Sequence, residues 1–545
     1  MLVPNRAATV LVIVIVIVLV IVLVIVLVLV LVLGWGTNEV KLKPKCIVST
    51  LARMMMKTDT VTASSPGKTG EGGRTPLFSG LKRRTVSRLA GLAALLGGLL
   101  SEMAICRGET DYLGVRSCSA VACHGNPPDP GTPQNLAGGE YVYWLENDPH
   151  ARAYDLLSSP TGLRMQELLR IRREGVLLNH EGFRNCLACH NLTTDIGPDG
   201  LALRAEGVSC EACHGPAPRW VATHYQSSSH ELDRAARMRR RNELGMANSL
   251  APATRSDTCL PCHVGAADRE VNHDLIAAGH PPLKFEMAAY HDGLPKHWDH
   301  CAERRDQSGW EFELWLHGQL SAARQALALL ATRAQRAQET SRTAAWPELS
   351  EYSCYACHHD LAWNRTRQRS RIGEARRPGQ LAWSNWYFAV LEHDEAGPPA
   401  LGKLRALMQR HIRPDPPQIG DAARRALAEL EDPGGTWQTS SSLRKKDWLR
   451  RQLQHQDAVR DWDTAAQIYL LATAFDLADR DERTAQGQAT PQLPADDPIL
   501  SLLSSVRQQL RFPTNYDGPR GIESETSPLE PLRHDFQKLA DLLGD

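Results

Sequence analysis

The clearest hydrophobic period in the chain lies ahead of residue 340. Apolar residues recur there at alternating four- and three-residue steps, which places them on one face of an amphipathic helix. They are Leu316, Leu320, Ala323, Leu327, Leu330 and Ala334. Beyond Asp360, apolar segments separated by Pro- and Gly-rich breaks predict further helices near residues 401–411, 421–431, 443–453, 462–477, 499–510 and 529–543.

The pattern is different upstream of that helix. Between residues 108 and 363, Gly, Pro and Asn are frequent and predict short helices and loops with little regular sheet. The predicted fold class is therefore mainly α, with one domain at 108–363 and a helical C-terminal domain at 364–545. The Trp residues of the C-terminal domain are expected to be core or packing aromatics rather than a binding site. They are Trp383, Trp386, Trp448 and Trp462.

Two apolar segments precede these domains. Residues 10–33 are an almost pure Val, Leu and Ile run, long enough to span a bilayer and repetitive enough to indicate a misplaced translation start within residues 1–80. Both interpretations stay open. At 81–107, four basic residues precede a twelve-residue apolar stretch, which predicts a Sec-type secretory signal peptide. A lipid anchor on Cys106 is disfavoured because Ile105 is larger than the small residue that usually precedes such a cysteine.

Ten of the 13 cysteines belong to one repeated pattern. Cys-x-x-Cys-His occurs four times, and a stretched copy with four residues between its thiols precedes them. In this pattern two thiols add across the vinyl groups of one haem, and the adjoining imidazole binds the haem iron. The copies are site 1 (Cys118, Cys123, His124), site 2 (Cys186, Cys189, His190), site 3 (Cys210, Cys213, His214), site 4 (Cys259, Cys262, His263) and site 5 (Cys354, Cys357, His358). The sequence therefore predicts five covalently bound haems c, which form much of the core of the 108–363 domain; site 1 departs from the usual spacing.

Other uses of paired cysteines fit less well. Zinc ribbons use two close Cys pairs per metal and need no His directly after the second Cys. A redox-active dithiol of the thioredoxin kind would occur once, beside a βαβ pattern. The remaining cysteines, Cys46, Cys106 and Cys301, are too few and too scattered for a disulfide framework. Equal numbers of acidic and basic residues give no general attraction to nucleic acid.

The second axial ligand of each iron decides between an electron carrier and an enzyme, because a second imidazole closes the iron to substrates. Five histidines are predicted as distal ligands. Aromatic residues precede His150 and His224, and His180 lies six residues before site 2. His273 and His280 flank a short helical stretch and can share a face while serving different haems.

Several residues compete with these candidates. His359 is the chief competitor because it directly follows the proximal His of site 5. The weaker candidates are His230, His291, His297, His300 and His317. Met246 and Met287 are expected to be packing residues. Arginines at 237–241 and 365–377 have three open interpretations: they neutralise haem propionates, dock an acidic redox partner or lie in solvated loops.

Four stretches between Tyr112 and Glu286, about a third of the chain, carry a family resemblance. They are Tyr112-Leu-Gly before site 1, Trp144 to His150-Ala-Arg-Ala, the Gly207-Val-Ser-Cys-Glu-Ala-Cys-His-Gly-Pro stretch with Trp220 and His224, and Asn272-His273 to His280-Pro-Pro-Leu with Phe285-Glu286. In these the chain resembles the multihaem family typified by cytochrome c-554. The resemblance implies a largely helical fold, stacked haem pairs, mostly bis-His ligation and a periplasmic electron-transfer role, with distal ligands at His150, His224 and His280. The family type has four haems, so site 5 and the C-terminal domain have no counterpart there.

The leading hypothesis is a periplasmic or otherwise extracytoplasmic electron-transfer protein with other redox proteins as donor and acceptor, exported and in one interpretation anchored by its N-terminal segment. The alternative is a redox enzyme with one five-coordinate haem acting on a small nitrogen or sulfur compound. A third hypothesis, that the C-terminal helices dock a membrane quinol oxidase or another partner, is compatible with the first. Because sites 2 and 3 are close in sequence, their haems are expected to be neighbours.

Overall fold

The computed structural model describes twelve stretches of the chain, all within one compact unit, Asp111–Asp545. The stretches are 112–127, 137–194, 206–226, 232–300, 303, 309–339, 345–354, 381–392, 397–431, 442–485, 497–511 and 530–543. The apolar run at 10–33, the predicted signal peptide at 81–107, and Cys357 and His358 of site 5 lie outside them. The same is true of His230, Cys301, His359 and the arginines at 365–377.

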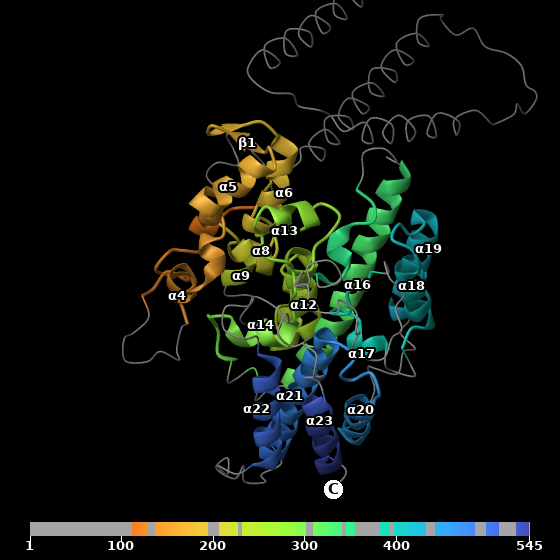
Figure 1. Cartoon of the computed structure of the whole chain (residues 1–545). Coiled ribbons are helices and arrows are strands. Elements are labelled where there is room, and N and C mark those ends of the chain that lie inside the picture. Colours follow the sequence, from red (N-terminus) through yellow and green to blue (C-terminus); the bar gives the residue numbers. More distant parts are fainter. Residues whose placement is uncertain are drawn as a thin grey trace, which may run out of the picture. The chain divides into compact units, whose positions relative to one another are not determined.

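Short helices and loops make up the part of the chain that carries sites 1 to 4 (Figure 1). Its α-helices are α4 (Glu140–Asn147), α5 (Pro160–Leu168), α6 (His180–His190), α8 (Cys210–His214), α9 (Val221–Tyr225), α11 (Arg234–Glu243), α12 (Pro252–His263), α13 (His273–Ala277) and α14 (Met287–Gly293). Single 3-10 turns are η1 (Val115–Ser117), η2 (Pro149–Arg152) and η3 (Asp155–Ser158). The named strands of the described residues are β1 (Arg172–Arg173) and β2 (Val176–Leu177), which pair antiparallel. The prediction of a mainly α fold with little sheet is confirmed.

Longer helices follow. They are α16 (Trp310–Glu339), α17 (Ala389–Glu392), α18 (Pro399–Arg410), α19 (Pro416–Glu431), α20 (Ser442–Gln454), α21 (Trp462–Ala485), α22 (Pro498–Leu510) and α23 (Glu530–Leu542), with the 3-10 turn η4 (Leu349–Glu351) after α16. Each helix predicted beyond Asp360 has a counterpart here. None of the helices in the described stretches is long and apolar enough to cross a bilayer.

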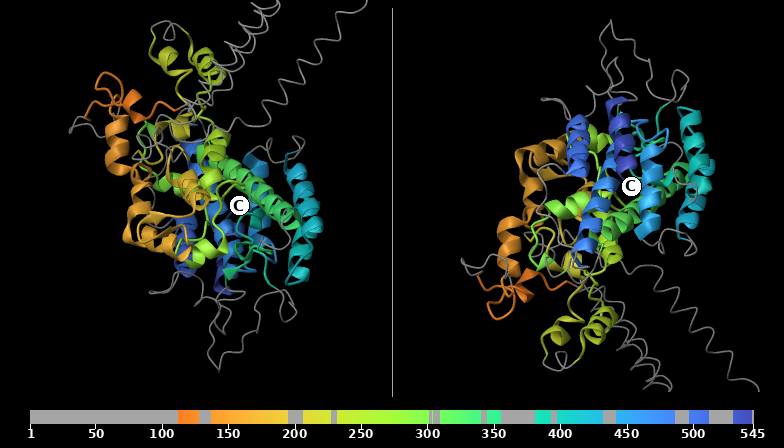
Figure 2. Two further views of the ribbon diagram at one scale, coloured as in Figure 1. Left: turned by 90° about the horizontal axis from the view of Figure 1, so that it is seen from above. Right: turned by 90° about the horizontal axis from the view of Figure 1, so that it is seen from below.

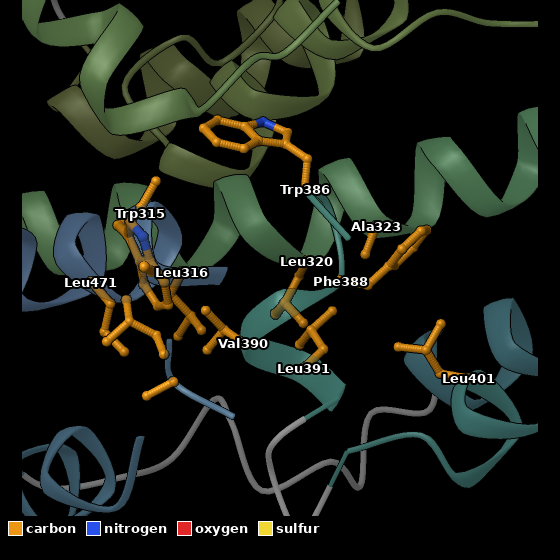
Figure 3. Packing of buried hydrophobic residues seen from close by; sticks show 14 of the residues in the cluster. Trp315, Leu316, Leu320, Ala323, Trp386, Phe388, Val390, Leu391, Leu401 and Leu471 are labelled. Carbon is orange, nitrogen blue, oxygen red and sulfur yellow. The ribbon is translucent and has the colours of Figure 1, made fainter. Parts of the chain in front are cut away.

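Helix α16 is the element on which the core is built. It packs against α12 and α14 from the part of the chain that carries sites 1 to 4, here called the haem-motif segment, and against α19 and α21 from the C-terminal part (Figures 1 and 2). The six apolar residues that predicted this helix are all 5% exposed or less. Figure 3 shows Leu316, Leu320 and Ala323 of α16 facing side chains from several other elements, among them Val390, Leu391 and Leu471.

The predicted Trp residues take part in this core. Trp383 and Trp386 are buried, and Trp448 and Trp462 are half-buried against the same cluster. Trp386 stacks on Trp462 with ring centres 5.9 Å apart. The boundary predicted at residue 363 stays a prediction, because residues 355–380 lie outside the described stretches.

Leu327→Ala tests the role of α16. Leu327 is fully buried, so removing its side chain should leave a cavity and lower the free energy of unfolding by about 2–5 kcal/mol. Leu477→Ala in α21 is the control, because Leu477 is 44% exposed. Urea unfolding followed by circular dichroism measures both. Equal stability losses in the two variants would contradict the assignment.

Candidate functional site

Sites 2, 3 and 4 each occupy the last turn of a helix. Site 2 ends α6, site 3 forms α8 and site 4 ends α12. A helical turn places its first Cys, second Cys and His at positions i, i+3 and i+4, which share one face. The cysteines of these motifs are free thiols. Local helix geometry therefore presents two thiols and one imidazole in the same direction.

Site 1 reaches a related arrangement without a helix. Its six-residue loop folds into consecutive turns, in which the Cys123 and Gly125 amides both donate to the Ala120 carbonyl, at 2.8 and 3.0 Å. The His124 amide then donates to the Cys118 carbonyl at 3.1 Å. In an α-helical Cys-x-x-Cys-His the His amide bonds to the carbonyl of the first Cys in the same way, four residues back. The two additional residues are thus absorbed in the turn, and His124 still lies beside Cys118.

Four proximal imidazoles each lie opposite a second imidazole. In every pair the second His lies outside the five motifs and is distant in sequence. The ring-centre distances are 6.0 Å for His124 and His224, 6.3 Å for His190 and His280, 6.2 Å for His214 and His297, and 6.0 Å for His263 and His150. All four separations fall within 0.3 Å of one another although the four pairs come from different elements.

This separation suits a shared metal ion. Imidazole nitrogens about 2 Å from one metal on opposite sides put the two ring centres roughly 6 Å apart. Direct packing of two rings is closer, as in the 4.6 Å between His263 and Phe285. Haem iron takes only two protein ligands, since the porphyrin supplies the other four. No cluster of three or more His, Cys, Asp or Glu ligands occurs among the described residues.

Hydrogen bonds orient several of these rings. Nδ1 of His124 lies 2.9 Å from Glu140 Oε2, and Nδ1 of His150 lies 2.9 Å from Asp148 Oδ1. Nδ1 of His190 and of His280 lies 2.8 Å from the backbone carbonyls of Ala153 and Pro281, respectively. A ring that donates Nδ1–H to such an acceptor keeps Nε2 available for a metal.

Burial keeps other rings neutral. It lowers the pKa of both His214 and His263 to about 4, so both are uncharged near neutral pH. Neutral imidazole is the form that binds metal. The Nδ1 atoms of His214 and His297 are buried without a hydrogen-bond partner, which is costly unless a further group completes this site.

Cysteine contacts bring different sites together. The Cys118 and Cys210 thiols of sites 1 and 3 interact, which lowers the pKa of Cys118 to about 6 and raises that of Cys210. The Cys189 and Cys262 thiols of sites 2 and 4 interact in the same way. The neighbours by thiol contact are therefore sites 1 and 3 and sites 2 and 4. The expectation that the haems of sites 2 and 3 are neighbours stays a prediction.

Glu211, between the two thiols of site 3, holds the segment that leads into site 1. Its carboxylate is buried and accepts hydrogen bonds from the amides of Leu113 (3.1 Å), Gly114 (2.7 Å) and Ala217 (2.6 Å). The contact crosses 97 residues of sequence. It explains how Cys118 comes to lie beside Cys210.

Gly207 allows the distal segment around His150 to approach site 3. Its φ of +64° lies in the left-handed region, and a Cβ there would lie 2.6 Å from the His150 carbonyl oxygen. The same carbonyl accepts a hydrogen bond from the Val208 amide at 3.0 Å. Glycine is the residue that meets both requirements.

Exposed apolar side chains gather in the haem-motif segment. Among the described residues, eleven of the fifteen exposed large apolar side chains lie between Leu113 and Tyr290. They are Leu113, Val121, Leu145, Leu156, Leu163, Leu168, Val176, Leu178, Tyr225, Leu232 and Tyr290. Such surface fits a segment whose apolar partner is a bound macrocycle rather than another side chain.

Two predicted distal ligands are not brought to a proximal His of sites 1 to 4. His180 is the exposed first residue of α6. His273 begins α13, and its amide donates to Glu348 Oε1 at 2.8 Å, six residues before Cys354 of site 5. The assignments of both stay predictions. Met287 is buried in a hydrophobic cluster, as expected of a packing residue.

His297, one of the weaker candidates in the sequence, lies closer to a proximal His than its rank predicts. It pairs with His214 and lies beside Trp298, with ring centres 5.2 Å apart. An adjacent aromatic residue had favoured other distal candidates, such as His224 with Trp220 four residues earlier. The same signal was present at His297 but followed the imidazole instead of preceding it.

Comparison with known proteins gives one family match. A family model described as cytochrome c554 and c-prime matches residues 118–215, which contain sites 1 to 3 and His150. No curated protein matches the chain. A search of solved structures likewise finds no match.

Glu211→Gln tests the link between sites 1 and 3. Glutamine leaves one oxygen for three donors and points an NH2 group at an amide, so the free energy of unfolding should fall by about 1–3 kcal/mol. Glu174→Gln is the matched control, since its side chain is 86% exposed. Urea unfolding measures both variants, and a wild-type value for Glu211→Gln would contradict the role assigned to this carboxylate.

Proposed function

We propose that this chain, a c-type cytochrome that resembles the cytochrome c554 family, is a multihaem electron carrier whose sites 1 to 4 each hold a bis-His haem. Cytochromes c of this kind act in electron transfer. Bound haem supplies the one-electron chemistry, and the chain's own residues hold, orient and shield it.

The observation that carries the proposal is the set of four imidazole pairs with ring centres 6.0–6.3 Å apart. Each pair joins one proximal His to one His outside the motifs. Two imidazoles occupy both axial positions of an iron, which leaves no open position for a substrate. This favours a carrier over an enzyme at these four sites.

The contacts between thiols support an order of transfer. Sites 1 and 3 form one pair through Cys118 and Cys210, and sites 2 and 4 form the other through Cys189 and Cys262. Helix α8, which holds site 3, packs against α12, which ends in site 4. In this proposal sites 3 and 4 form the junction between the pairs, and electrons would cross the module in the order 1, 3, 4, 2 or its reverse.

Site 5 completes the set of five haems in this proposal, with His273 as its distal ligand. The Glu348 carboxylate ties the His273 amide to η4, which leads directly into Cys354. Arg333 fixes this region to α16 through ion pairs with Glu351 at 2.6 Å and Glu270 at 2.8 Å. A redox enzyme with one open iron remains the alternative, and site 5 is where that iron would lie.

The proposal includes an extracytoplasmic location, because c-type haems are attached on that side of the membrane and the basic and apolar pattern at 81–107 is that of a Sec-type signal. The partners are other redox proteins that donate and accept single electrons. The N-terminal run would add membrane anchoring if it belongs to the mature chain.

His297→Ala and His180→Ala distinguish the proposed distal ligand of site 3 from the exposed His. Removing His297 should convert one low-spin haem to a high-spin, carbon-monoxide-binding haem, because one axial position opens. In this proposal His297 takes the role that the sequence gave to His180, so His180→Ala should leave all haems as in the wild type. Low-temperature electron paramagnetic resonance and carbon monoxide titration measure both outcomes.

Added imidazole should restore the low-spin signal in His297→Ala and so separate ligand loss from unfolding. A high-spin haem in His180→Ala, with none in His297→Ala, would contradict the pairing. A wild-type protein with one haem that binds carbon monoxide would favour the enzyme alternative.

The intact mass of the mature protein tests the number of haems. Five covalent haem additions are expected when the chain is made in a host competent for cytochrome maturation, and a Cys118→Ala/Cys123→Ala variant should carry four. An unchanged haem count in this variant would remove site 1 from the proposal.

A further inference from the structure

Arg255 is a buried cation held between two tryptophans. Its guanidinium carbon lies 5.0 Å from the ring centre of Trp298 and 5.0 Å from that of Trp310. It forms an ion pair with Glu303 at 2.5 Å and donates to Nε2 of His291 at 2.6 Å. The Arg255 side chain is 11% exposed and that of Glu303 is 2% exposed, so solvent screens this charge weakly.

Arg255, Trp298, Trp310 and Glu303, here called the cage, lie where sites 3 and 4 meet. Arg255 belongs to α12, four residues before Cys259 of site 4. On its other side, the Trp298 ring centre lies 5.2 Å from that of His297, which pairs with His214 of site 3. The guanidinium is therefore no more than about 10 Å from the His297 ring.

Further contacts fix the position of the charge. Nε and Nη2 of Arg255 both donate to the Ser249 carbonyl, at 2.9 and 2.5 Å. Trp298 Nε1 donates to the second oxygen of Glu303 at 2.9 Å. These hydrogen bonds and the ion pair with Glu303 restrain the guanidinium, so it has little freedom to turn away from sites 3 and 4.

A fixed positive charge beside a haem favours the reduced iron, which carries one positive charge fewer. Glu303 offsets part of this stabilisation of the reduced iron, because its carboxylate carries the opposite charge. The offset is incomplete because the carboxylate and the guanidinium lie at different distances from the haem.

We propose that Arg255 raises the reduction potentials of sites 3 and 4 and so controls the passage of electrons between the two haem pairs. The proposal rests on the bis-His carrier function described above. Arg255 touches no haem ligand directly and acts through its charge, held in place by Trp298 and Glu303.

Arg255→Gln, Arg255→Lys and Glu303→Gln test this role by redox titration of the full-length holoprotein with optical and electron paramagnetic resonance detection. Arg255→Gln should lower two of the midpoint potentials. A charge about 10 Å away at an effective dielectric constant of about 20 changes the reduction equilibrium roughly tenfold, which is about 60 mV for a one-electron couple. Glu303→Gln should shift the same potentials upward, and Arg255→Lys should retain most of the wild-type value.

Arg405→Gln is the matched control. Arg405 is also a buried cation, 5.1 Å from the Trp383 ring centre and in an ion pair with Glu392 at 2.5 Å, and it lies among the C-terminal helices. Its loss should destabilise the protein without moving the potentials of sites 3 and 4. Shifts of opposite sign in Arg255→Gln and Glu303→Gln cannot come from general destabilisation.

The inference fails if Arg255→Gln leaves all potentials unchanged, or if Arg405→Gln shifts the same haems equally. Failure of the carrier function is a separate result, visible in the wild type as an absence of low-spin bis-His haems before any variant is compared.

Discussion

The distance between facing imidazoles is the constraint on which the rest of the module depends. If each pair holds a haem iron as proposed, its ring centres must stay about 6 Å apart, because a shorter distance would leave no room for a metal and a longer one would break a bond to it. The chain meets this requirement with rings from separate elements, such as His150 in η2 and His263 in α12. Hydrogen bonds to Nδ1 and burial hold these rings in place.

The C-terminal helices contribute to this arrangement from outside the haem motifs. Trp386 Nε1 donates to the Phe285 carbonyl at 2.9 Å, and the Tyr387 hydroxyl donates to the Leu283 carbonyl at 2.8 Å. Lys284, between Leu283 and Phe285, forms an ion pair with Asp463 at 2.7 Å. The segment they hold follows His280 and packs Phe285 against His263. The helical part of the chain thus fixes a segment that lies next to two of the proposed axial ligands.

Local patterns in the sequence predicted α16 and six of the helices beyond Asp360, and the errors in their bounds have local causes. Helix α19 begins at Pro416, five residues before the predicted start, because proline is tolerated in the first turn and was taken for a break. Helix α21 continues past Leu477 to Ala485 through polar residues. The ion pairs of Arg480 with Asp476 and of Arg483 with Asp479, each one turn apart, support that extension.

The motif cysteines and proximal histidines could be predicted without any structure, because each His directly follows the second Cys of a short, repeated pattern. The pairing of distal histidines could not, since His150 and His263 meet across more than a hundred residues and no local pattern encodes that contact. His297 illustrates the limit: its immediate neighbours resemble those of other candidates, and only the fold brings it to His214.

Site 1 shows which feature of a haem-attachment motif is structurally essential. Its thiols are two residues further apart than in the other sites, yet the His124 amide still closes on the Cys118 carbonyl. The length of the intervening loop can therefore vary as long as that backbone ring closes. If site 1 holds a haem as proposed, surveys of genomes that count only the shortest spacing will underestimate the number of redox centres in chains of this kind.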